Sequence, residues 1–315
     1  MRGRKFSVAC VGLRSFTLIE VLVSVTIMVL VVILFASVLG GVNRAWLRGE
    51  QQVETYQNGR AILELIVREL AQAQISSRLQ FIDSPNISPI CPNQAACSSL
   101  FWQGPLLSST NGNMCEVGYY LTRQDPTPSS VGIYELNRFF IGPAAGPTYL
   151  ISNLSYAPTS TGAPWLTGLT LSQFAAASTV VSDGVLAFWV RCIDQNGYAI
   201  PWMTSTVKFN SAGYFEPAQP GTVPATNQVG VYPPWTSNTT EQANQLPAAV
   251  EITIVTVDSK TLARKPIIPN LASYQPANEN DIQNQVNRFN AALLANNVQA
   301  ARTFFTRVDL VNAYR

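Results

Sequence analysis

Glu20 is an ionisable residue at the edge of a strongly apolar stretch. The 22 residues from Val21 to Val42 carry no formal charge. A carboxylate inside lipid costs about 3 kcal/mol unless it is paired, so a carboxylate in this position indicates a functional site. No Lys or Arg lies between Ser15 and Asn43. We therefore expect the partner of Glu20 to come from another chain or from a new amino terminus.

The apolar stretch is long enough to cross a membrane as a helix. At about 1.5 Å per residue it extends about 33 Å, and the core of a bilayer is about 30 Å thick. We therefore expect a single-pass inner-membrane protein whose N-terminus is cytoplasmic and whose later residues lie in the periplasm or outside the cell. The orientation follows from the charges before Ser15, which are all basic: Arg2, Arg4, Lys5 and Arg14.

The residues around Glu20 resemble the signal of type IV prepilins. The block is Phe16-Thr17-Leu18-Ile19-Glu20-Val21-Leu22-Val23, and it follows a basic leader. The resemblance implies that a prepilin peptidase cuts between Ser15 and Phe16 and that Phe16 is then N-methylated. It also implies that Glu20 neutralises the terminal amine of a neighbouring pilin-like subunit during assembly. The family usually has Gly before the cut, where this chain has Ser15.

A plain signal anchor is the alternative interpretation of the first 42 residues. It accounts for the basic leader and for the apolar stretch, but it does not account for the ordered block around Glu20. The two interpretations differ in their partners. The prepilin interpretation requires a prepilin peptidase, the inner membrane and other pilin-like or pseudopilin subunits that pack against this helix.

The composition excludes several classes of function. Charged residues make up 12% of the chain, about half of the usual ~25%, which suits an exported domain better than a cytosolic enzyme. The formal charge is +2, or −2 for residues 16–315, and gives no indication of nucleic-acid binding. The absence of His excludes His-dependent nucleophilic catalysis and His-ligated catalytic metals. We expect no enzymatic activity, no cofactor and no metal.

Four cysteines lie beyond the apolar stretch, where an oxidising compartment would favour two disulfides. They allow three pairings. We favour one bond between Cys91 and Cys97, across a Pro-rich loop, and another between Cys115 and Cys192, joining two strand regions. A zinc site is the alternative, but zinc sites prefer close Cys or Cys/His pairs and the chain has no His.

Helical periodicity continues after Val42. We expect one helix from about Thr17 to about Ser76, with Gly40-Gly41 and Gly59 as candidate bends. The segments are then a leader (1–15), a transmembrane helix (16–42), an amphipathic continuation (43–78) and an exported β-rich domain (79–315). The apolar residues that recur at helical steps in the continuation are Val53, Tyr56, Leu63, Val67 and Leu70.

Two segments resemble the J-type minor pseudopilins of type II secretion. Residues 59–73 are similar to the helix that follows the membrane segment in that family, and residues 246–258 are similar to its late strand. The two segments also occur in the same order. The prepilin-like cassette protein C of verrucomicrobial genomes shares this outline.

The remaining sequence predicts an antiparallel β domain with a C-terminal helix and strand. Asp194-Gln195-Asn196-Gly197 is a turn signal, from which we expect residues 198–203 to return as a strand. Asn278–Asp281 is expected to cap the late helix, although a calcium site is the alternative. Expected strands cover 117–121, 132–140, 185–192, 250–257 and 303–311, and expected loops cover 79–100, 142–182 and 210–247. The late helix follows the cap at 278–281 and ends near Asn296-Asn297.

The sequence thus predicts an α+β, pilin-like protein with a long N-terminal helix on an antiparallel β domain. The function implied by the resemblance is structural: a minor pseudopilin or pilin-like subunit that helps to start or cap a short periplasmic filament. The alternative is a surface-displayed binding module that uses the pilin signal only for export. Its Trp-bearing loops in 142–247 would make the recognition contacts. The tryptophans that could mark a binding face, or could instead be core or loop anchors, are Trp102, Trp165, Trp189, Trp202 and Trp235.

Overall fold

The chain forms two units, residues 1–50 and residues 51–315. The computed structural model describes residues 17–315 except for 77, 86, 93, 96, 108–111, 124–133, 144–148, 150, 152–162, 195, 201, 203–207, 213–245, 265 and 315. The fold is α+β with a pilin-like architecture, as predicted: a long apolar N-terminal helix followed by antiparallel sheets.

Helix α1 (Leu18–Leu70) is continuous for 53 residues and passes through all three glycines that were candidate bends. It ends at Leu70, earlier than the expected Ser76. The reason is that the chain turns here to join a sheet, since the Ala73 amide donates to the Leu70 carbonyl at 2.9 Å and the Gln74 amide donates to the Gln103 carbonyl at 3.0 Å.

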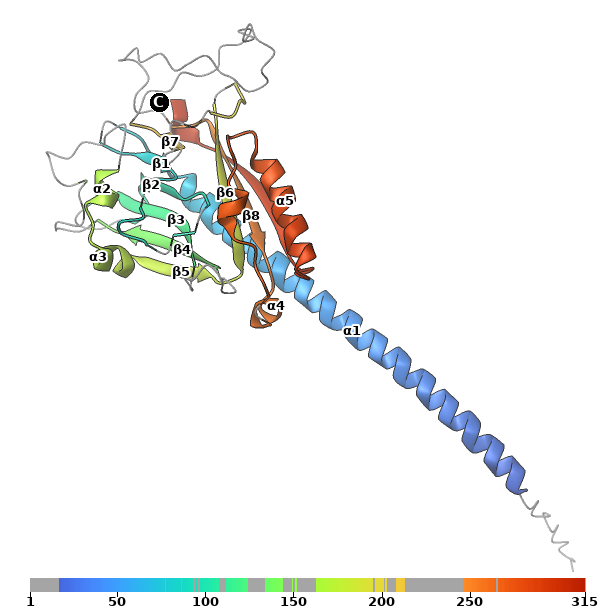
Figure 1. The fold of residues 1–315 in the computed structure, drawn as a ribbon. Helices are drawn as coiled ribbons and strands as arrows, with labels where there is room; N and C mark the ends of the chain where they lie inside the picture. Colours follow the sequence, from blue (N-terminus) through green and yellow to red (C-terminus); the bar gives the residue numbers. More distant parts are fainter. Residues whose placement is uncertain are drawn as a thin grey trace, which may run out of the picture. The chain divides into compact units, whose positions relative to one another are not determined.

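The domain contains two antiparallel sheets (Figure 1). The strands of the larger sheet are, in spatial order, β5 (Ser178–Ser182), β4 (Tyr134–Ile141), β3 (Cys115–Arg123), β2 (Leu100–Gly104), β1 (Phe81–Asp83) and β7 (Phe209–Asn210). The strands of the smaller sheet are β6 (Val185–Ile193), β8 (Ala249–Thr256) and β9 (Arg302–Asp309).

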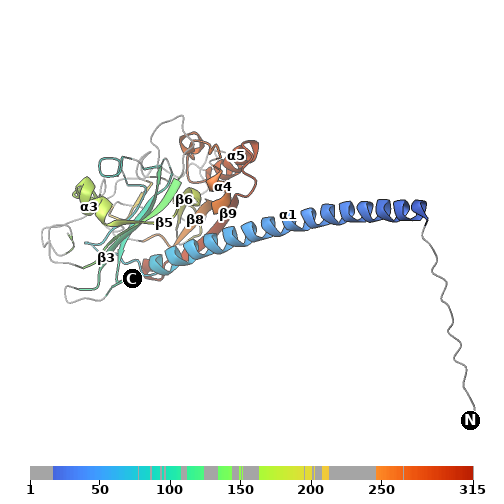
Figure 2. The same ribbon diagram turned by 90° about the horizontal axis from the view of Figure 1, so that it is seen from below.

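Short helices cover the outer faces of both sheets. Figures 1 and 2 show α3 beside the larger sheet, and α5 on the side of the smaller sheet that faces away from the larger one. Ring contacts fix both placements, with centroids 5.1 Å apart for Phe139 and Phe174 and 5.9 Å apart for Trp189 and Phe289. The helical elements after α1 are α2 (Pro164–Thr167), α3 (Leu171–Ala176), α4 (Ser259–Ala263), η2 (Leu271–Tyr274), α5 (Ile282–Ala295) and η3 (Val311–Tyr314).

The main core joins the second half of α1 to the inner faces of both sheets. Alternate residues of β3 point into it, as expected for a strand whose successive side chains face opposite ways. A second core lies on the other face of the larger sheet, beneath α2 and α3. The side chains that α1 buries in the main core are Ile62, Leu63, Ile66 and Leu70.

Gly59 lets strand β9 approach α1 closely. A Cβ atom at this position would lie 2.5 Å from the ring of Phe304, and the same ring packs edge-on against Tyr56 with centroids 5.5 Å apart. Gly59 is therefore a packing residue and not a bend.

A buried ion pair fixes the end of α1 to the larger sheet. The Arg138 guanidinium on β4 donates from Nε and Nη2 to the two carboxylate oxygens of Glu69, at 3.0 and 2.8 Å. The Tyr119 hydroxyl on β3 donates to the same carboxylate at 2.6 Å. Because the side chain of Glu69 is only 8% exposed, bulk water screens the attraction between the two charges only weakly.

Three expectations about the strands need correction. The stretch 79–100 was expected to be a loop, but it contains β1, and β2 begins at its end. Among the described residues after Asp194, the return pairs with the free edge of β6 at one bridge, Ile193 to Ala199, and forms no strand. The turn itself is present, with Gly197 at φ +84°.

Strand β8 was expected to be half-buried, but both of its faces are covered. It is the central strand of the smaller sheet, between the main core and α5, so even its alternate polar residue Thr253 is only 8% exposed. The expected strands β3, β4, β6 and β9 and the helix α5 are confirmed within a few residues. The loop expectation for 142–182 holds for its described residues, which form only the short elements α2, α3 and β5.

We expect Glu69→Ala to destabilise the domain by about 2–3 kcal/mol, because it leaves the Arg138 charge and the Tyr119 hydroxyl without their partner. This is below the value for a fully buried pair, since a quarter of the Arg138 side chain is exposed. Guanidinium unfolding of the full chain in detergent measures the effect. Glu64→Ala on the same helix is the control, and its exposed pair with Arg60 should leave the midpoint unchanged. Equal midpoints for the two variants would contradict the role of Glu69.

Gly59→Ala should lower the unfolding midpoint, by about 1–3 kcal/mol, although Ala is the better helix former. The added methyl group would displace the Phe304 ring. Gly49→Ala is the matched control, because a Cβ there meets nothing within 4 Å. Its midpoint should stay the same or rise. A rise for Gly59→Ala would show that the close approach to β9 is unimportant.

Candidate membrane and assembly site

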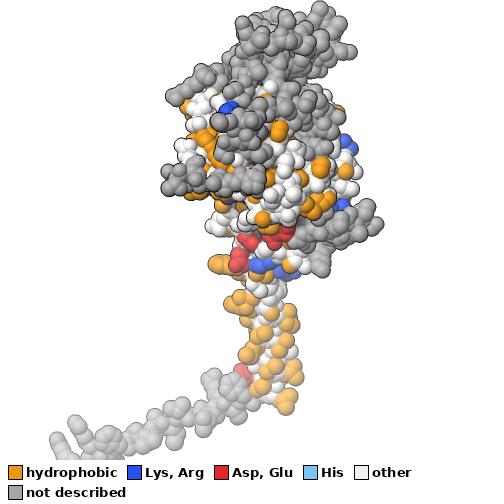
Figure 3. All heavy atoms as spheres, turned by 90° about the vertical axis from the view of Figure 1, so that its left-hand side faces the viewer, with side chains coloured by type: hydrophobic (Ala, Val, Ile, Leu, Met, Phe, Trp, Pro, Cys, Tyr) orange, Lys and Arg blue, Asp and Glu red, His pale blue; other side chains and the backbone are white. Residues whose placement is uncertain are grey.

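The first half of α1 exposes a predominantly apolar surface. Between Leu18 and Val42 every large apolar side chain is 48–84% exposed within this chain. Figure 3 shows these side chains around the helix. By length and composition the helix can cross a membrane. A monomeric protein in water rarely leaves such a surface bare, so this one requires lipid or other apolar helices.

Glu20 lies in the first turn of α1, where Thr17 is the residue before the helix. The Glu20 amide donates to the Thr17 carbonyl at 3.0 Å and faces the Thr17 hydroxyl at 3.4 Å. Both residues fit the beginning of a helix, and a carboxylate there interacts favourably with the helix dipole. The Glu20 side chain is exposed, and it makes no ion pair within the part of the chain that the structure describes.

The other predicted processing residues, Ser15 and Phe16, lie outside the described residues, as does the basic leader. The structure therefore places only the carboxylate of the predicted assembly site, together with the apolar surface that follows it.

The two predicted disulfides are not formed in this structure. Cys97, Cys115 and Cys192 are free, buried thiols. For the first pair the reason is the sheet itself, because Cys97 lies in the main core and Cys91 lies in the second core on the opposite face. For the second pair, the larger sheet is linked to β6 by residues 95–98, which bind β3 at Leu121 and β6 at Phe188. Cys115 lies at the opposite end of β3 from Leu121.

A buried polar group, here called the Lys208 cluster, contains Asp83, Cys97, Ser98, Cys192 and Lys208. The Lys208 Nζ atom donates to the Ser98 hydroxyl at 2.7 Å, and it lies 4.6 Å from the centroid of the Trp202 ring. Burial lowers the pKa of Lys208, and it raises the pKa of Asp83 to about 6. The carboxylate and both thiols oppose the effect of burial on the ammonium.

Three of the five tryptophans that could mark a binding face are buried instead. Trp102, Trp165 and Trp189 are at most 1% exposed and pack in the two cores. Trp202 is half-buried and covers Lys208. Trp235 lies outside the described residues. The four described candidates therefore do not form an exposed aromatic face.

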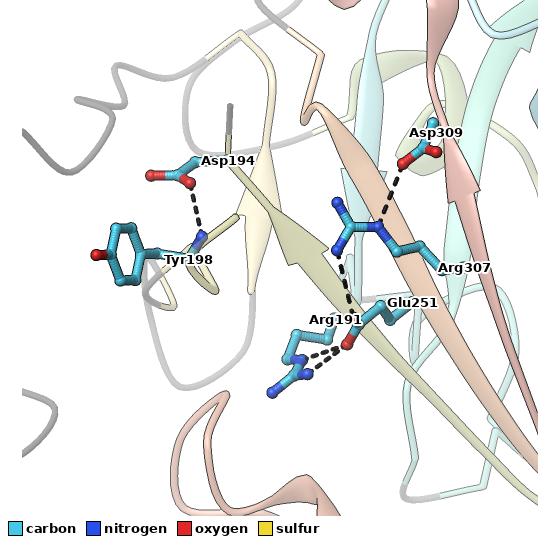
Figure 4. Close-up of polar contacts among 6 residues, drawn as sticks. All are labelled: Arg191, Asp194, Tyr198, Glu251, Arg307 and Asp309. Atoms are coloured by element: carbon cyan, nitrogen blue, oxygen red, sulfur yellow. Dashed lines mark hydrogen bonds and ion pairs between the residues drawn. The ribbon is translucent and has the colours of Figure 1, made fainter. Parts of the chain in front are cut away.

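A charged network crosses the outer face of the smaller sheet (Figure 4). Arg191 on β6, Glu251 on β8 and Arg307 on β9 are cross-strand neighbours. Arg191 donates from Nε to Glu251 at 2.8 Å, and Arg307 lies 3.9 Å from the same carboxylate and donates to Asp309 at 3.2 Å. The network pairs the charges of three strands and contributes modestly to stability because it borders solvent.

Beside this network is a small cleft between the sheet and the start of α5. Its volume is about 40 Å³, which is room for one or two water molecules and not for an organic substrate. Residues lining it include Trp189, Glu251, Ile282 and Phe305.

Glu116 is a buried acid that the sequence did not single out. It lies on β3 opposite Gln103 of β2 and Ile141 of β4, and its side chain is fully covered. Within the part of the chain that the structure describes, neither carboxyl oxygen nor the Gln103 Nε2 atom has a hydrogen-bond partner. Burial raises the pKa of Glu116 well above its usual value, and the nearby Gln103 amide lowers it only in part. The carboxyl group therefore keeps its proton to a higher pH than an exposed glutamate does.

Little in the sequence indicated that Glu69, Glu116 and Lys208 would be buried. Glu69 belongs to an amphipathic helix whose other charges are exposed, and Glu116 stands in a strand where an outward-facing position would suit an acid. Their surroundings come from distant parts of the chain: Glu69 contacts β3 and β4, Glu116 lies between β2 and β4, and Lys208 binds Ser98.

The pH dependence of stability should change in Glu116→Gln. Below about pH 4.5 the wild-type carboxyl is protonated in both the folded and unfolded states. As the pH rises, the unfolded carboxyl ionises while the folded one keeps its proton, which costs up to about 1.4 kcal/mol per pH unit until the raised pKa is reached. Denaturation midpoints should therefore diverge in favour of the variant as the pH rises above about 4.5. Parallel curves would contradict the buried, neutral acid.

No protein-family model, curated protein or solved structure matches this chain.

Proposed function

We propose that this protein is a structural, pilin-like subunit, anchored in the inner membrane by α1 and assembled into a short periplasmic filament. The resemblance to J-type minor pseudopilins favours a low-copy subunit of a type II secretion or type IV pilus-like system. The proposal includes cleavage between Ser15 and Phe16 by a prepilin peptidase and N-methylation of Phe16.

The observation that carries this proposal is the uncovered apolar half of α1. Before assembly, lipid would cover the apolar side chains from Leu18 to Val42. In a filament, equivalent helices of neighbouring subunits would cover them. Both environments are apolar, so the chain could move from one to the other without exposing this surface to water.

Glu20 supplies the specificity that apolar packing lacks. A carboxylate at the edge of lipid costs about 3 kcal/mol when it is alone, and it gains that energy back when a cation is placed beside it. The methylated amine of a neighbouring Phe16 would be such a cation. Because the pair forms at only one stagger of two parallel helices, Glu20 would set the register of the filament.

The two segments that resemble J-type pseudopilins both belong to structural elements of the main core. Residues 59–70 are the last turns of α1, and residues 249–256 are β8. Both contribute buried side chains to the same core. The resemblance thus concerns the framework that holds α1 on the domain, which suits a structural subunit.

The test is Glu20→Ala in the native host. The variant should enter the membrane at the wild-type level, because its apolar stretch is unchanged, yet its recovery in crosslinked complexes with other pilin-like subunits should fall at least tenfold. Glu20→Gln keeps the shape of the side chain and removes its charge, so it should fail in the same way.

Glu64→Ala is the matched control, since Glu64 is an exposed acid on the same helix beyond the apolar stretch. It should assemble normally. Normal incorporation of Glu20→Ala would remove the proposed role of the carboxylate.

A further inference from the structure

Trp46 is a large aromatic residue that belongs to neither of the two cores. It follows the apolar stretch of α1 by four residues, and its side chain is 74% exposed. Arg44 and Arg48 lie two residues before and after it and are also exposed. Neither arginine makes an ion pair within the described part of the chain. We call residues 44–48 the boundary segment.

The boundary segment lies one bilayer thickness from Glu20. Because α1 is continuous from Leu18 to Leu70, each residue advances about 1.5 Å along the helix. Trp46 is 26 residues from Glu20, which corresponds to about 39 Å. The hydrocarbon core of a bilayer is about 30 Å thick, and its thickness with both headgroup regions is about 40–45 Å. When Glu20 is in one headgroup region, the boundary segment is therefore in the other.

The residue types in the boundary segment are typical of the border between a membrane and water. Trp is enriched there because its ring is apolar and its indole N–H is polar. Arg can place its methylene groups in the apolar region and its guanidinium among phosphate groups. The Arg44 side chain extends back toward the apolar stretch, since its Nε atom donates to the Gly40 carbonyl at 3.1 Å. Its guanidinium thus lies beside the last turn of that stretch.

The distribution of these residues around the helix favours lipid over a protein partner. At about 100° per residue, Arg44 and Arg48 lie about 40° apart on one side of the helix, and Trp46 lies about 160° from each of them. A protein partner would contact one side, whereas a bilayer surrounds the helix. The large apolar side chains from Leu18 to Val42 are also exposed all round, by 48–84%.

We propose that the boundary segment is an interfacial anchor. Arg44 and Arg48 bind the phosphate groups of acidic phospholipids in the non-cytoplasmic leaflet, and Trp46 lies among the headgroups beside them. The inference rests on the proposed function, because it requires α1 to span the membrane with its N-terminus in the cytoplasm. It adds a lipid partner and a defined depth of insertion, at which Glu20 lies in the cytoplasmic headgroup region.

The depth of Trp46 is tested with the full chain in phosphatidylcholine vesicles whose acyl chains carry bromine, which quenches indole fluorescence on contact. The bromine is placed either near the headgroup or near the bilayer centre. Trp46→Phe is the control, because the other five tryptophans lie between residues 102 and 235, in the domain. The difference between wild type and control is the signal of Trp46. We expect the shallow bromine to quench this signal about twofold more than the deep one.

Two results would overturn the anchor, and carbonate extraction of the same vesicles distinguishes them. If the chain resists extraction but Trp46 is quenched equally by both lipids or by neither, the anchor is removed and the proposed membrane function stands. If carbonate extracts the chain, both proposals fail, because no segment then spans the bilayer.

The role of the arginines is tested by the preference of the chain for phosphatidylglycerol over phosphatidylcholine, measured by electron spin resonance with spin-labelled lipids. Arg44→Gln/Arg48→Gln should lower this preference by about twofold or more, since each basic residue near a membrane surface attracts acidic lipid. The basic leader also attracts acidic lipid, but it is the same in all the chains compared.

Arg60→Gln/Arg68→Gln is the matched control, because it removes two exposed arginines of the same helix that lie beyond the boundary segment. It should keep the wild-type preference. An equal fall in this control would overturn the lipid assignment. An unchanged preference in Arg44→Gln/Arg48→Gln would also overturn it and would indicate acidic side chains of a neighbouring subunit as the partners of the two arginines.

Discussion

An apolar helix surface that its own chain leaves bare is the constraint on which the rest of the structure depends. The large apolar side chains from Leu18 to Val42 are all at least 48% exposed, and no folding of residues 51–315 changes the chemistry of that surface. Lipid or neighbouring helices must therefore complete it. Glu20 stands at the start of this surface, and a carboxylate in such a place is tolerated when something cationic meets it. Lipid would cover this apolar surface after membrane insertion, and neighbouring helices would cover it after the proposed assembly.

The same helix meets a different apolar environment beyond Gln51. Its last turns enter the main core through Ile62, Ile66 and Leu70, so the protein interior takes over the role that lipid has for the first half. Two features define this junction. Gly59 removes the side chain that would keep β9 away, and Glu69 is held by two groups from the larger sheet. One helix is thereby fixed to both sheets.

Local patterns in the sequence predicted the parts of the fold that depend on local chemistry. The long helix and strands β3, β4, β6, β8 and β9 followed from periodicity, and Gly197 marked its turn. Strand β1 was missed because it is three residues long in a Pro-rich stretch and exists through pairing with β2 and β7.

The favoured cysteine pairs were wrong for this structure for a similar reason: sequence spacing does not reveal which face of a sheet a loop residue joins. Burial of Glu116 likewise depends on distant elements. At the proposed assembly site, Glu20 was singled out by its contrast with the residues around it, which is a local property.

The mass of the intact chain, purified from the membranes of its own host under reducing conditions, bears most directly on the proposed function. A chain that begins at Phe16 and carries one added methyl group on its amine is the predicted result. It would establish that Ser15 permits cleavage and that a pilin-type amino terminus is available to a neighbouring Glu20. A full-length chain starting at Met1 would contradict the proposal, because the basic leader would then remain attached to the helix and no new amine would exist.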